Sequence, residues 1–215
     1  PAVPLNATKR VTAYARKHGW QLETIDAGEF EDERYRANPV NRCYYCKLNL
    51  YGTIAKLCDG PIASGTNCDD LDDYRPGLDA ARRNNVVHPH VEAGLGKRDI
   101  YRMANQLGLD DLSVLPAQPC LASRIETGLA VHPDDLGFVE KVEGLIHDHI
   151  GVSAILRCRL LLQGVVLELD EQFLNSRLAP GLARMVEDLC VEEERHFLGL
   201  RAYRRGSAFH LEGRW

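Results

Sequence analysis

Apolar residues recur at two different spacings along the first half of the chain. Helical spacing predicts four helices, over residues 6–18, 48–58, 78–83 and 100–107. Short apolar runs between these segments predict three strands, at residues 22–25, 61–65 and 86–91. Strands that alternate with helices imply a parallel sheet with helices on both faces, so we expect an α/β domain here.

The pattern changes after a loop at residues 116–128. We expect a helix to begin at Pro133, because proline suits the first helical position. The elements expected after this helix are a hairpin of residues 154–162 and 165–169, a long helix over 171–193 and a strand over 196–203. Together they make a small α+β domain. We therefore place a boundary near residue 130 and expect two domains, residues 1–130 and 131–215.

Composition and charge narrow the class of protein. The chain carries 26 Lys and Arg against 31 Asp and Glu, a net charge of −5, which argues against a general nucleic-acid coat protein. No apolar stretch approaches the roughly 20 residues that a membrane-spanning helix needs. The N-terminal residues lack the pattern of a secretory signal. We expect a soluble cytoplasmic protein with no membrane partner.

Seven cysteines supply the first candidate chemistry. Their odd number, in a chain too large to need disulfides, indicates a reducing compartment. Cys43 and Cys46 form a C-x-x-C just before a predicted helix, where the helix dipole lowers thiol pKa values and favours metal binding or redox work. An inert thiol pair is the alternative. Cys120, in a loop beside Ser123 and Arg124, is the natural third ligand.

The other cysteines and several charged residues allow two interpretations each. Cys58, Cys158 and Cys190 fall on apolar positions, so we expect core residues. Lys97 and Arg98 open a predicted helix, where two cations oppose the dipole, and an anionic ligand would remove that conflict. Solvated surface charges are the alternative.

Arg157 and Arg159 alternate with apolar residues, so a strand would place both guanidiniums on one face. That face suits phosphate or carboxylate binding, or it is simply the solvated side of an antiparallel sheet. The acidic loop at residues 69–73 could hold magnesium or cap a helix. His88 and His90 are a possible zinc pair, which we disfavour because no C-x-x-C lies near them in the chain.

Three segments carry a family resemblance: Asn41–Lys47, Ser64–Leu78 and Cys120–Ile125. They resemble the LarE family, ATP-dependent sulfur transferases that build the nickel-pincer nucleotide cofactor. The resemblance extends over nearly the whole chain. It implies a Rossmann-like parallel sheet of the PP-loop ATP pyrophosphatase type, related to the adenine nucleotide alpha hydrolases, followed by a small α+β domain.

The resemblance also implies a reaction. In that family, ATP adenylates a carboxylate of a pyridinium dicarboxylate mononucleotide, and sulfur then replaces an oxygen to give a thiocarboxylate. Cys120 matches the sulfur-bearing position, and family members with only this cysteine end as dehydroalanine. Members that also carry the C-x-x-C form a cluster-dependent subgroup. In that subgroup, Cys43, Cys46 and Cys120 would hold a 4Fe-4S cluster whose fourth iron carries hydrosulfide.

Further roles follow from the same resemblance. Glu143 matches a catalytic position. The ATP and Mg²⁺ side of the site would use Gly65, Thr66, Asn67 and Asp69. The nucleotide substrate would be held by Ser123, Arg124, Arg157, Arg159 and Lys97. A homo-oligomer is also expected.

One departure concerns the family's phosphate loop, a Ser-Gly-Gly-x-Asp-Ser segment that these 215 residues do not contain. That loop supplies the N–H groups that bind pyrophosphate. We therefore expect an N-terminally incomplete sheet, and we expect ATP use to belong to a longer protein. Two alternatives remain: a PP-loop tRNA thiolation enzyme, which the acidic net charge disfavours, and a non-catalytic, zinc-stabilised binding module.

Overall fold

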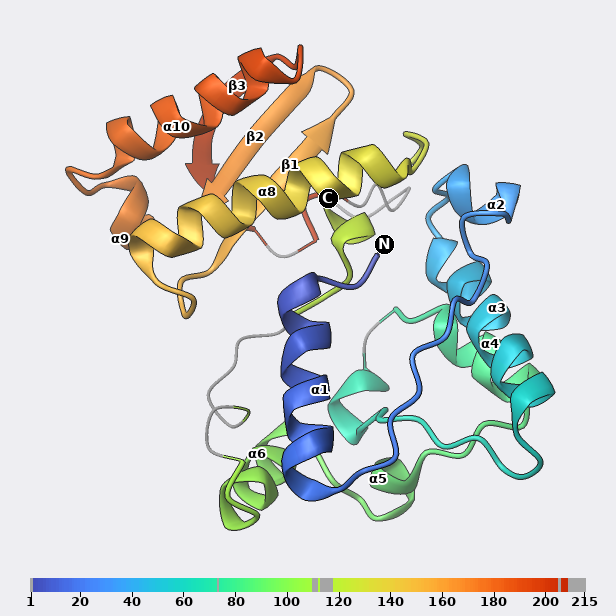
Figure 1. Cartoon of the computed structure of the whole chain (residues 1–215). Coiled ribbons are helices and arrows are strands. Elements are labelled where there is room, and N and C mark those ends of the chain that lie inside the picture. The colour runs from blue at the N-terminus through green and yellow to red at the C-terminus, as the bar shows by residue number, and fades with distance from the viewer. Residues whose placement is uncertain (1, 73, 110–111, 113–117, 205, 209–215) are drawn as a thin grey trace. The chain divides into compact units, whose positions relative to one another are not determined.

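The computed structural model describes residues 2–72, 74–109, 112, 118–204 and 206–208. The chain divides into two compact units (Figure 1). The sheet unit comprises residues 1–24 and 118–215, and the helical unit comprises residues 25–117. These compact units do not follow the domain boundary expected near residue 130, because residues 1–24 group with the C-terminal part of the chain. The domain boundary itself stays a prediction.

The sheet unit contains a three-stranded mixed sheet in the order β1-β2-β3. Strands β1 (Leu156–Leu161) and β2 (Gly164–Leu169) form an antiparallel hairpin, which confirms the hairpin prediction. Strand β3 (Phe197–Ala202) pairs with β2 in parallel. Gly164 opens β2 at φ 145°, and a Cβ at this position would lie 2.4 Å from the carbonyl oxygen of His196. The residue at position 164 must therefore be glycine, because the backbone just before β3 lies too close for a side chain.

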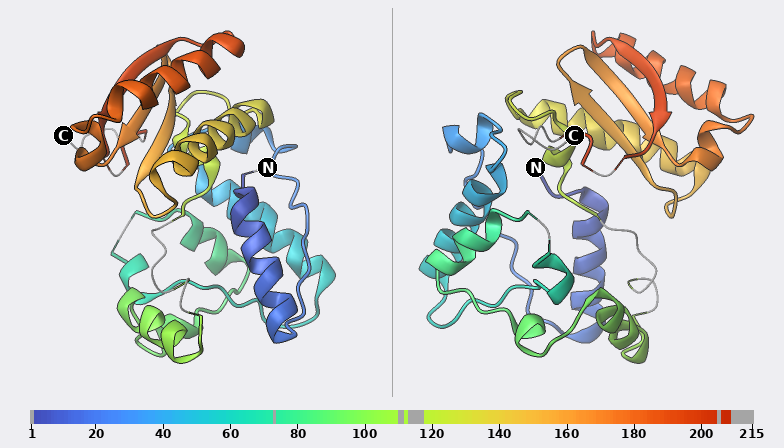
Figure 2. Two further views of the ribbon diagram at one scale, coloured as in Figure 1. Left: turned by 60° about the vertical axis from the view of Figure 1, so that its left-hand side comes forward. Right: turned by 180° about the vertical axis from the view of Figure 1, so that it is seen from behind.

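Two helices, α8 (Pro133–Ile150) and α10 (Ala179–Glu192), pack against the apolar face of this sheet (Figures 1 and 2). Helix α8 begins at Pro133, as predicted. Its Val142 and Ile146, and Leu167 at the centre of the sheet, are completely buried. The alternation of β1 and β2 thus gives one apolar face, and the helices cover it.

The long helix predicted over residues 171–193 is wrong. The segment forms a short helix α9 (Glu171–Leu174) and then α10, which begins at Ala179. Pro180 lies in the first turn of α10, where its missing N–H costs nothing, whereas inside a continuous helix it would remove a backbone hydrogen bond. The hydroxyl of Ser176 accepts a hydrogen bond from the N–H of Leu178 at the break.

The N-terminal segment of the sheet unit forms α1 (Leu5–His18), as predicted, and Gly19 ends it in the left-handed conformation at φ 67°. The carbonyl of Ala2, which precedes the helix, accepts a hydrogen bond of 2.8 Å from the N–H of Leu121. Leu121 begins the 3₁₀ turn η2 (Leu121–Arg124). Residues 116–117 of the predicted loop lie outside the described residues.

The helical unit contains five helices and one 3₁₀ turn whose bounds lie wholly within the described residues. They are α2 (Glu33–Arg36), α3 (Arg42–Leu57), η1 (Cys68–Asp70), α4 (Gly77–Arg83), α5 (Pro89–Glu92) and α6 (Lys97–Gln106). Helices α3 and α4 pack together around Tyr51, Ala81 and Val86. The predicted helices near 48–58, 78–83 and 100–107 are confirmed.

The prediction of three parallel strands between residues 22 and 91 is mostly wrong. Within the described part of the helical unit, parallel pairing is limited to one bridge, between Ala63 and Val87. Residues 22–25 have no regular structure. Pro89 lacks an N–H group and starts α5, which ends the extended segment after Val87. The chain is thus a mixed α and β protein whose described sheet lies in the sheet unit. No described helix is long and apolar enough to span a membrane.

Replacing Leu167 tests the buried centre of the sheet. We expect Leu167→Ala to lower the free energy of unfolding by about 2–5 kcal/mol, because the truncation leaves a cavity in a closed core. Leu162→Ala is the matched control, since Leu162 in the hairpin turn is 79% exposed. Urea unfolding measures both variants, and equal losses would contradict this description of the core.

Candidate functional site

The polar face of the sheet carries Arg157 and Arg159, as the alternation predicts. Both are buried, at 9% and 3% exposure. The alternative that they lie on a solvated outer face is therefore wrong. A buried guanidinium needs compensating partners, because its desolvation costs several kcal/mol.

Glu168 on β2 supplies one compensating charge and has no exposed surface. Its Oε2 accepts a hydrogen bond from Nε of Arg159 at 2.8 Å. Its Oε1 accepts from Nε of Arg201 on β3 at 3.0 Å and from the hydroxyl of Ser207 at 2.6 Å. The register places Arg157, Glu168 and Arg201 opposite one another across the three strands. Glu168 therefore joins all three strands on this face.

Glu143 on α8 supplies the second compensating charge. Its two carboxylate oxygens accept from Nε and Nη2 of Arg124 at 2.9 and 2.8 Å, a bidentate pair. Its Oε1 also accepts from the backbone N–H of Cys158 at 3.0 Å. Cys158 lies on the outer edge strand, so Glu143 satisfies a backbone donor that the sheet leaves open.

Arg157 lies opposite Glu168 in the hairpin, and the charges of Arg124 and Glu143 act on it. Its Nη1 donates to the carbonyl of Leu156 at 2.6 Å, and its guanidinium lies 5.8 Å from the ring centre of Tyr203. Burial lowers the pKa of Arg157, and the charge of Arg124 lowers it further. We call the six residues the arginine network: Arg124, Arg157, Arg159, Arg201, Glu143 and Glu168. Four members of this network are arginines and two are glutamates, so it is rich in guanidinium groups.

The loop that carries Cys120 is attached to this network through Arg124. Nη1 of Arg124 donates to the carbonyls of Pro119 and Cys120 at 2.7 and 3.0 Å, and to the hydroxyl of Ser123 at 3.2 Å. Nη1 of Arg159 donates to the carbonyl of Ser123 at 3.0 Å. The Cys120 residue itself is half-buried. The structure therefore brings Ser123, Arg124, Glu143, Arg157 and Arg159 together beside Cys120.

Cys43 and Cys46 lie within the first two turns of α3, not before the helix as expected. Residues three apart share one face of a helix, so these two half-buried cysteines can serve a common ligand. Between them, Tyr44 and Tyr45 meet edge to face, and Arg34 lies 5.0 Å from the ring centre of Tyr45. Convergence of this pair with Cys120 stays a prediction, because the two groups belong to different compact units.

The loop around residues 65–70 is held by its own polar groups. Asn67 caps η1 by accepting from the N–H of Asp69 at 3.1 Å, and Asp70 Oδ2 accepts from the Asn67 amide at 2.8 Å. Asp70 Oδ1 also pairs with Arg75 at 2.8 Å and with Lys97 at 3.3 Å. These bonds favour the capping interpretation of the acidic loop over a magnesium site. Asp73 lies outside the described residues.

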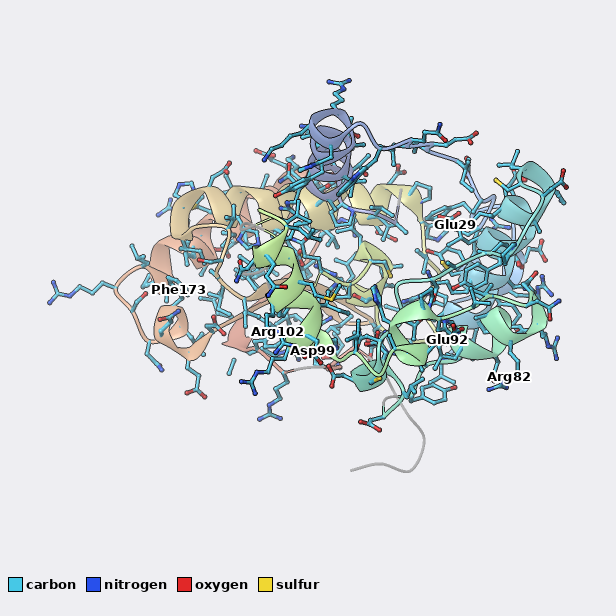
Figure 3. The ribbon with its side chains drawn as sticks, turned by 90° about the horizontal axis from the view of Figure 1, so that it is seen from below. Glu29, Arg82, Glu92, Asp99, Arg102 and Phe173 are labelled. Atoms are coloured by element: carbon cyan, nitrogen blue, oxygen red, sulfur yellow. The ribbon has the colours of Figure 1, made fainter. Side chains whose placement is uncertain are left out.

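The cations at the start of α6 do not require an external anion. The carboxylate of Asp69 accepts from the backbone N–H of Lys97, and Asp99 accepts from the N–H of Gly96 at 3.2 Å. Protein carboxylates thus occupy the positive end of this helix. Asp99 also forms a surface ion pair with Arg102, in which Oδ1 and Nη2 are 2.9 Å apart (Figure 3). A role for Lys97 in substrate binding stays a prediction.

Sequence reasoning missed a hydroxyl–imidazole cluster beside Gly65 and Thr66. The Ser64 hydroxyl lies 2.7 Å from Nδ1 of His88 and 2.9 Å from the Thr66 hydroxyl. Ser64 and His88 directly follow the bridged pair Ala63 and Val87. Ser64 and His88 each follow a short apolar run. This position could have indicated a site, because ligands of α/β proteins bind at the carboxyl ends of parallel strands.

Sequence reasoning also missed Glu168 and Arg201. Glu168 is a carboxylate inside the apolar run 165–169, opposite Arg157 in the hairpin. A charged residue inside a predicted buried strand needs a partner, so the hairpin register was a sufficient signal for Glu168. The sequence pattern does not show which strand β3 pairs with, so it could not place Arg201 beside Glu168.

The core assignment is confirmed for two cysteines and wrong for the third. Cys158 and Cys190 are buried, and burial raises the pKa of both thiols, to about 11 for Cys190. Cys58 is exposed. It follows the last residue of α3 with an extended backbone, so helical periodicity no longer sets its direction. Among the described residues, no three His, Cys, Asp or Glu side chains form a group that could hold a metal ion.

Comparison with known proteins gives two relatives. The chain is 36% identical over 135 residues to the uncharacterized protein slr1717 of Synechocystis sp., which covers 61% of this chain and 50% of the relative. It is 27% identical over 161 residues to the uncharacterized protein MJ0830 of Methanocaldococcus jannaschii, which covers 73% of this chain and 60% of the relative. The chain thus spans half to three fifths of these relatives. No protein-family model matches it.

Removing the Glu168 charge tests the arginine network. We expect Glu168→Gln to lower the free energy of unfolding by about 3–5 kcal/mol, because Arg159 would stay buried without its carboxylate. The control is Lys141→Ala, which removes a surface cation that pairs with Glu192 and Glu193, and its unfolding midpoint should not change. Thermal unfolding compares them, and a stable Glu168→Gln variant would show that the network is not held by this charge.

Proposed function

We propose that the chain belongs to an ATP-dependent sulfur transferase of the LarE type, with a PP-loop ATP pyrophosphatase fold. The substrate would be a pyridinium dicarboxylate mononucleotide. One observation carries the proposal: a half-buried Cys120 lies in a loop that Arg124 connects to a buried network of arginines and glutamates. An anionic substrate and a sulfur-bearing residue would meet there.

The network supports binding of the nucleotide phosphate and carboxylates. Guanidinium groups bind these anions through paired N–H donors. Burial and the Arg124 charge lower the pKa of Arg157, so an anion beside it would favour its charged form. Arg201 is 41% exposed and contributes a guanidinium that solvent can reach. The phosphate and carboxylates of the substrate would bind these guanidinium groups.

The reaction has two steps. A substrate carboxylate oxygen attacks the α-phosphorus of ATP and releases pyrophosphate, and sulfide then attacks the acyl carbon and releases AMP, which leaves a thiocarboxylate. A 4Fe-4S cluster would supply nucleophilic sulfide when bound, with Cys43, Cys46 and Cys120 as its ligands. Cys43 and Cys46 fit two ligand positions, because they share one face of α3 and are half-buried. Gly65, Thr66, Asn67 and Asp69 would line the ATP side of the site, as the resemblance implies.

Mononucleotide binding tests the substrate class. We expect nicotinic acid mononucleotide to bind the chain, and Arg157→Ala and Arg159→Ala to weaken binding by about tenfold or more, as loss of a charge-assisted pair does. The matched control is Arg184→Ala, an exposed arginine on α10 that should leave the Kd unchanged. Calorimetry measures all three variants. Unchanged affinity in both network variants, or binding of tRNA without the mononucleotide, would contradict the proposal.

Metal analysis tests the cluster ligands. We expect iron and acid-labile sulfide in anaerobically purified protein, and we expect Cys43→Ser and Cys46→Ser each to lose most of both, because thiolates are the cluster ligands. Cys58→Ser removes an exposed cysteine and should keep the iron content. Zinc without sulfide would instead favour the non-catalytic binding module.

A further inference from the structure

Arg124 and Glu143 are bound in a way that suits neither substrate binding nor proton transfer. The Arg124 side chain is 4% exposed, and each of its three guanidinium nitrogens already donates a hydrogen bond. A phosphate needs two parallel N–H groups that it can reach. Both oxygens of Glu143 accept hydrogen bonds, and Oε1 accepts two. A general base needs a reachable lone pair.

The same bonds form a continuous connection from the sheet to the Cys120 main chain. The N–H of Cys158 on β1 binds Glu143 on α8, and Glu143 binds Arg124. Arg124 in turn donates to the carbonyls of Pro119 and Cys120. This connection fixes the backbone on both sides of the Cys120 Cα atom. The loop is also anchored further on, where Ile125 bridges to Leu160.

We propose that Arg124 and Glu143 are positioning residues that hold the Cys120 backbone in place, rather than a substrate ligand and a catalytic group. The inference rests on the proposed function, in which Cys120 bears sulfur or holds the cluster. Small errors in the position of a reacting group cost large factors in rate, so a rigid backbone at this residue has a clear chemical use. Substrate contacts would then be left to Arg157, Arg159 and Arg201.

The experiment measures the rate at which iodoacetamide alkylates each cysteine, resolved by peptide mapping, together with the Kd for nicotinic acid mononucleotide. We expect Glu143→Ala to raise the Cys120 rate about tenfold, since a loosened loop opens more often. Glu143→Gln keeps one acceptor and the side-chain volume, so its effect should be smaller. Arg124→Lys should resemble Glu143→Ala, because an ammonium cannot replace the bidentate fork. Mononucleotide affinity should stay within about twofold in all three variants.

Three references keep the result decisive. Rates are expressed relative to exposed Cys58 and to Cys46, since a bound cluster would protect Cys46 and Cys120 together. Val186→Ala removes a fully buried side chain from α10, which packs on β2, β3 and α8, so it should lower the melting temperature and leave the Cys120 rate unchanged. A general loss of stability is thereby separated from a local loss of positioning.

Two results would overturn the proposal. One is an unchanged Cys120 rate in Glu143→Ala and Arg124→Lys, and the other is a tenfold loss of mononucleotide affinity in either. Failure of the unaltered chain to bind the mononucleotide would count against the proposed function alone, because the alkylation rates report on the loop whether or not a nucleotide binds.

Discussion

A carboxylate with no exposed surface lies on the polar face of the three-stranded sheet, and its charge must be compensated within the protein. Glu168 meets this constraint by binding Arg159 from β1, Arg201 from β3 and the hydroxyl of Ser207. Loss of Glu168 would leave the buried guanidinium of Arg159 without this carboxylate. The positions of the strands, and of the segment after β3, are therefore coupled to one side chain.

The same constraint explains how several arginines can share one side of the sheet. Clustered guanidiniums repel one another unless negative charge lies between them, and Glu143 and Glu168 provide it. Residue type alone does not distinguish the environments of these arginines. Arg124 and Arg159 bind buried carboxylates with side chains only 4% exposed, whereas the side chain of Arg201 is 41% exposed although it binds Glu168 as well.

The sequence predicted elements best where a single period dominates. The β1–β2 hairpin followed from two extended runs joined by Gln163 and Gly164, and the apolar stripe of α8 followed from its helical spacing. The prediction of one helix over residues 171–193 was wrong because the apolar spacing does not reveal the break between α9 and α10. Pro180 marks the first turn of the second helix. The strands predicted near Ala63 and Val87 were mostly wrong, because an apolar run does not specify a pairing partner. Within the described residues, these two segments pair through a single bridge. In the site, alternation placed Arg157 and Arg159 on one face, but burial and ion pairing depend on residues far away in the chain.

The parallel pairing of β3 with β2 has a consequence for the order of folding. The hairpin needs only a turn of two residues, whereas β3 arrives after a crossover through α9 and α10. Local contacts form sooner than contacts that close a long loop. Glu168 can therefore pair with Arg159 early, within the hairpin, and it gains Arg201 and Ser207 only when the crossover closes. The last strand and the second guanidinium of Glu168 therefore arrive together, which makes the final step of assembly sensitive to ionic strength.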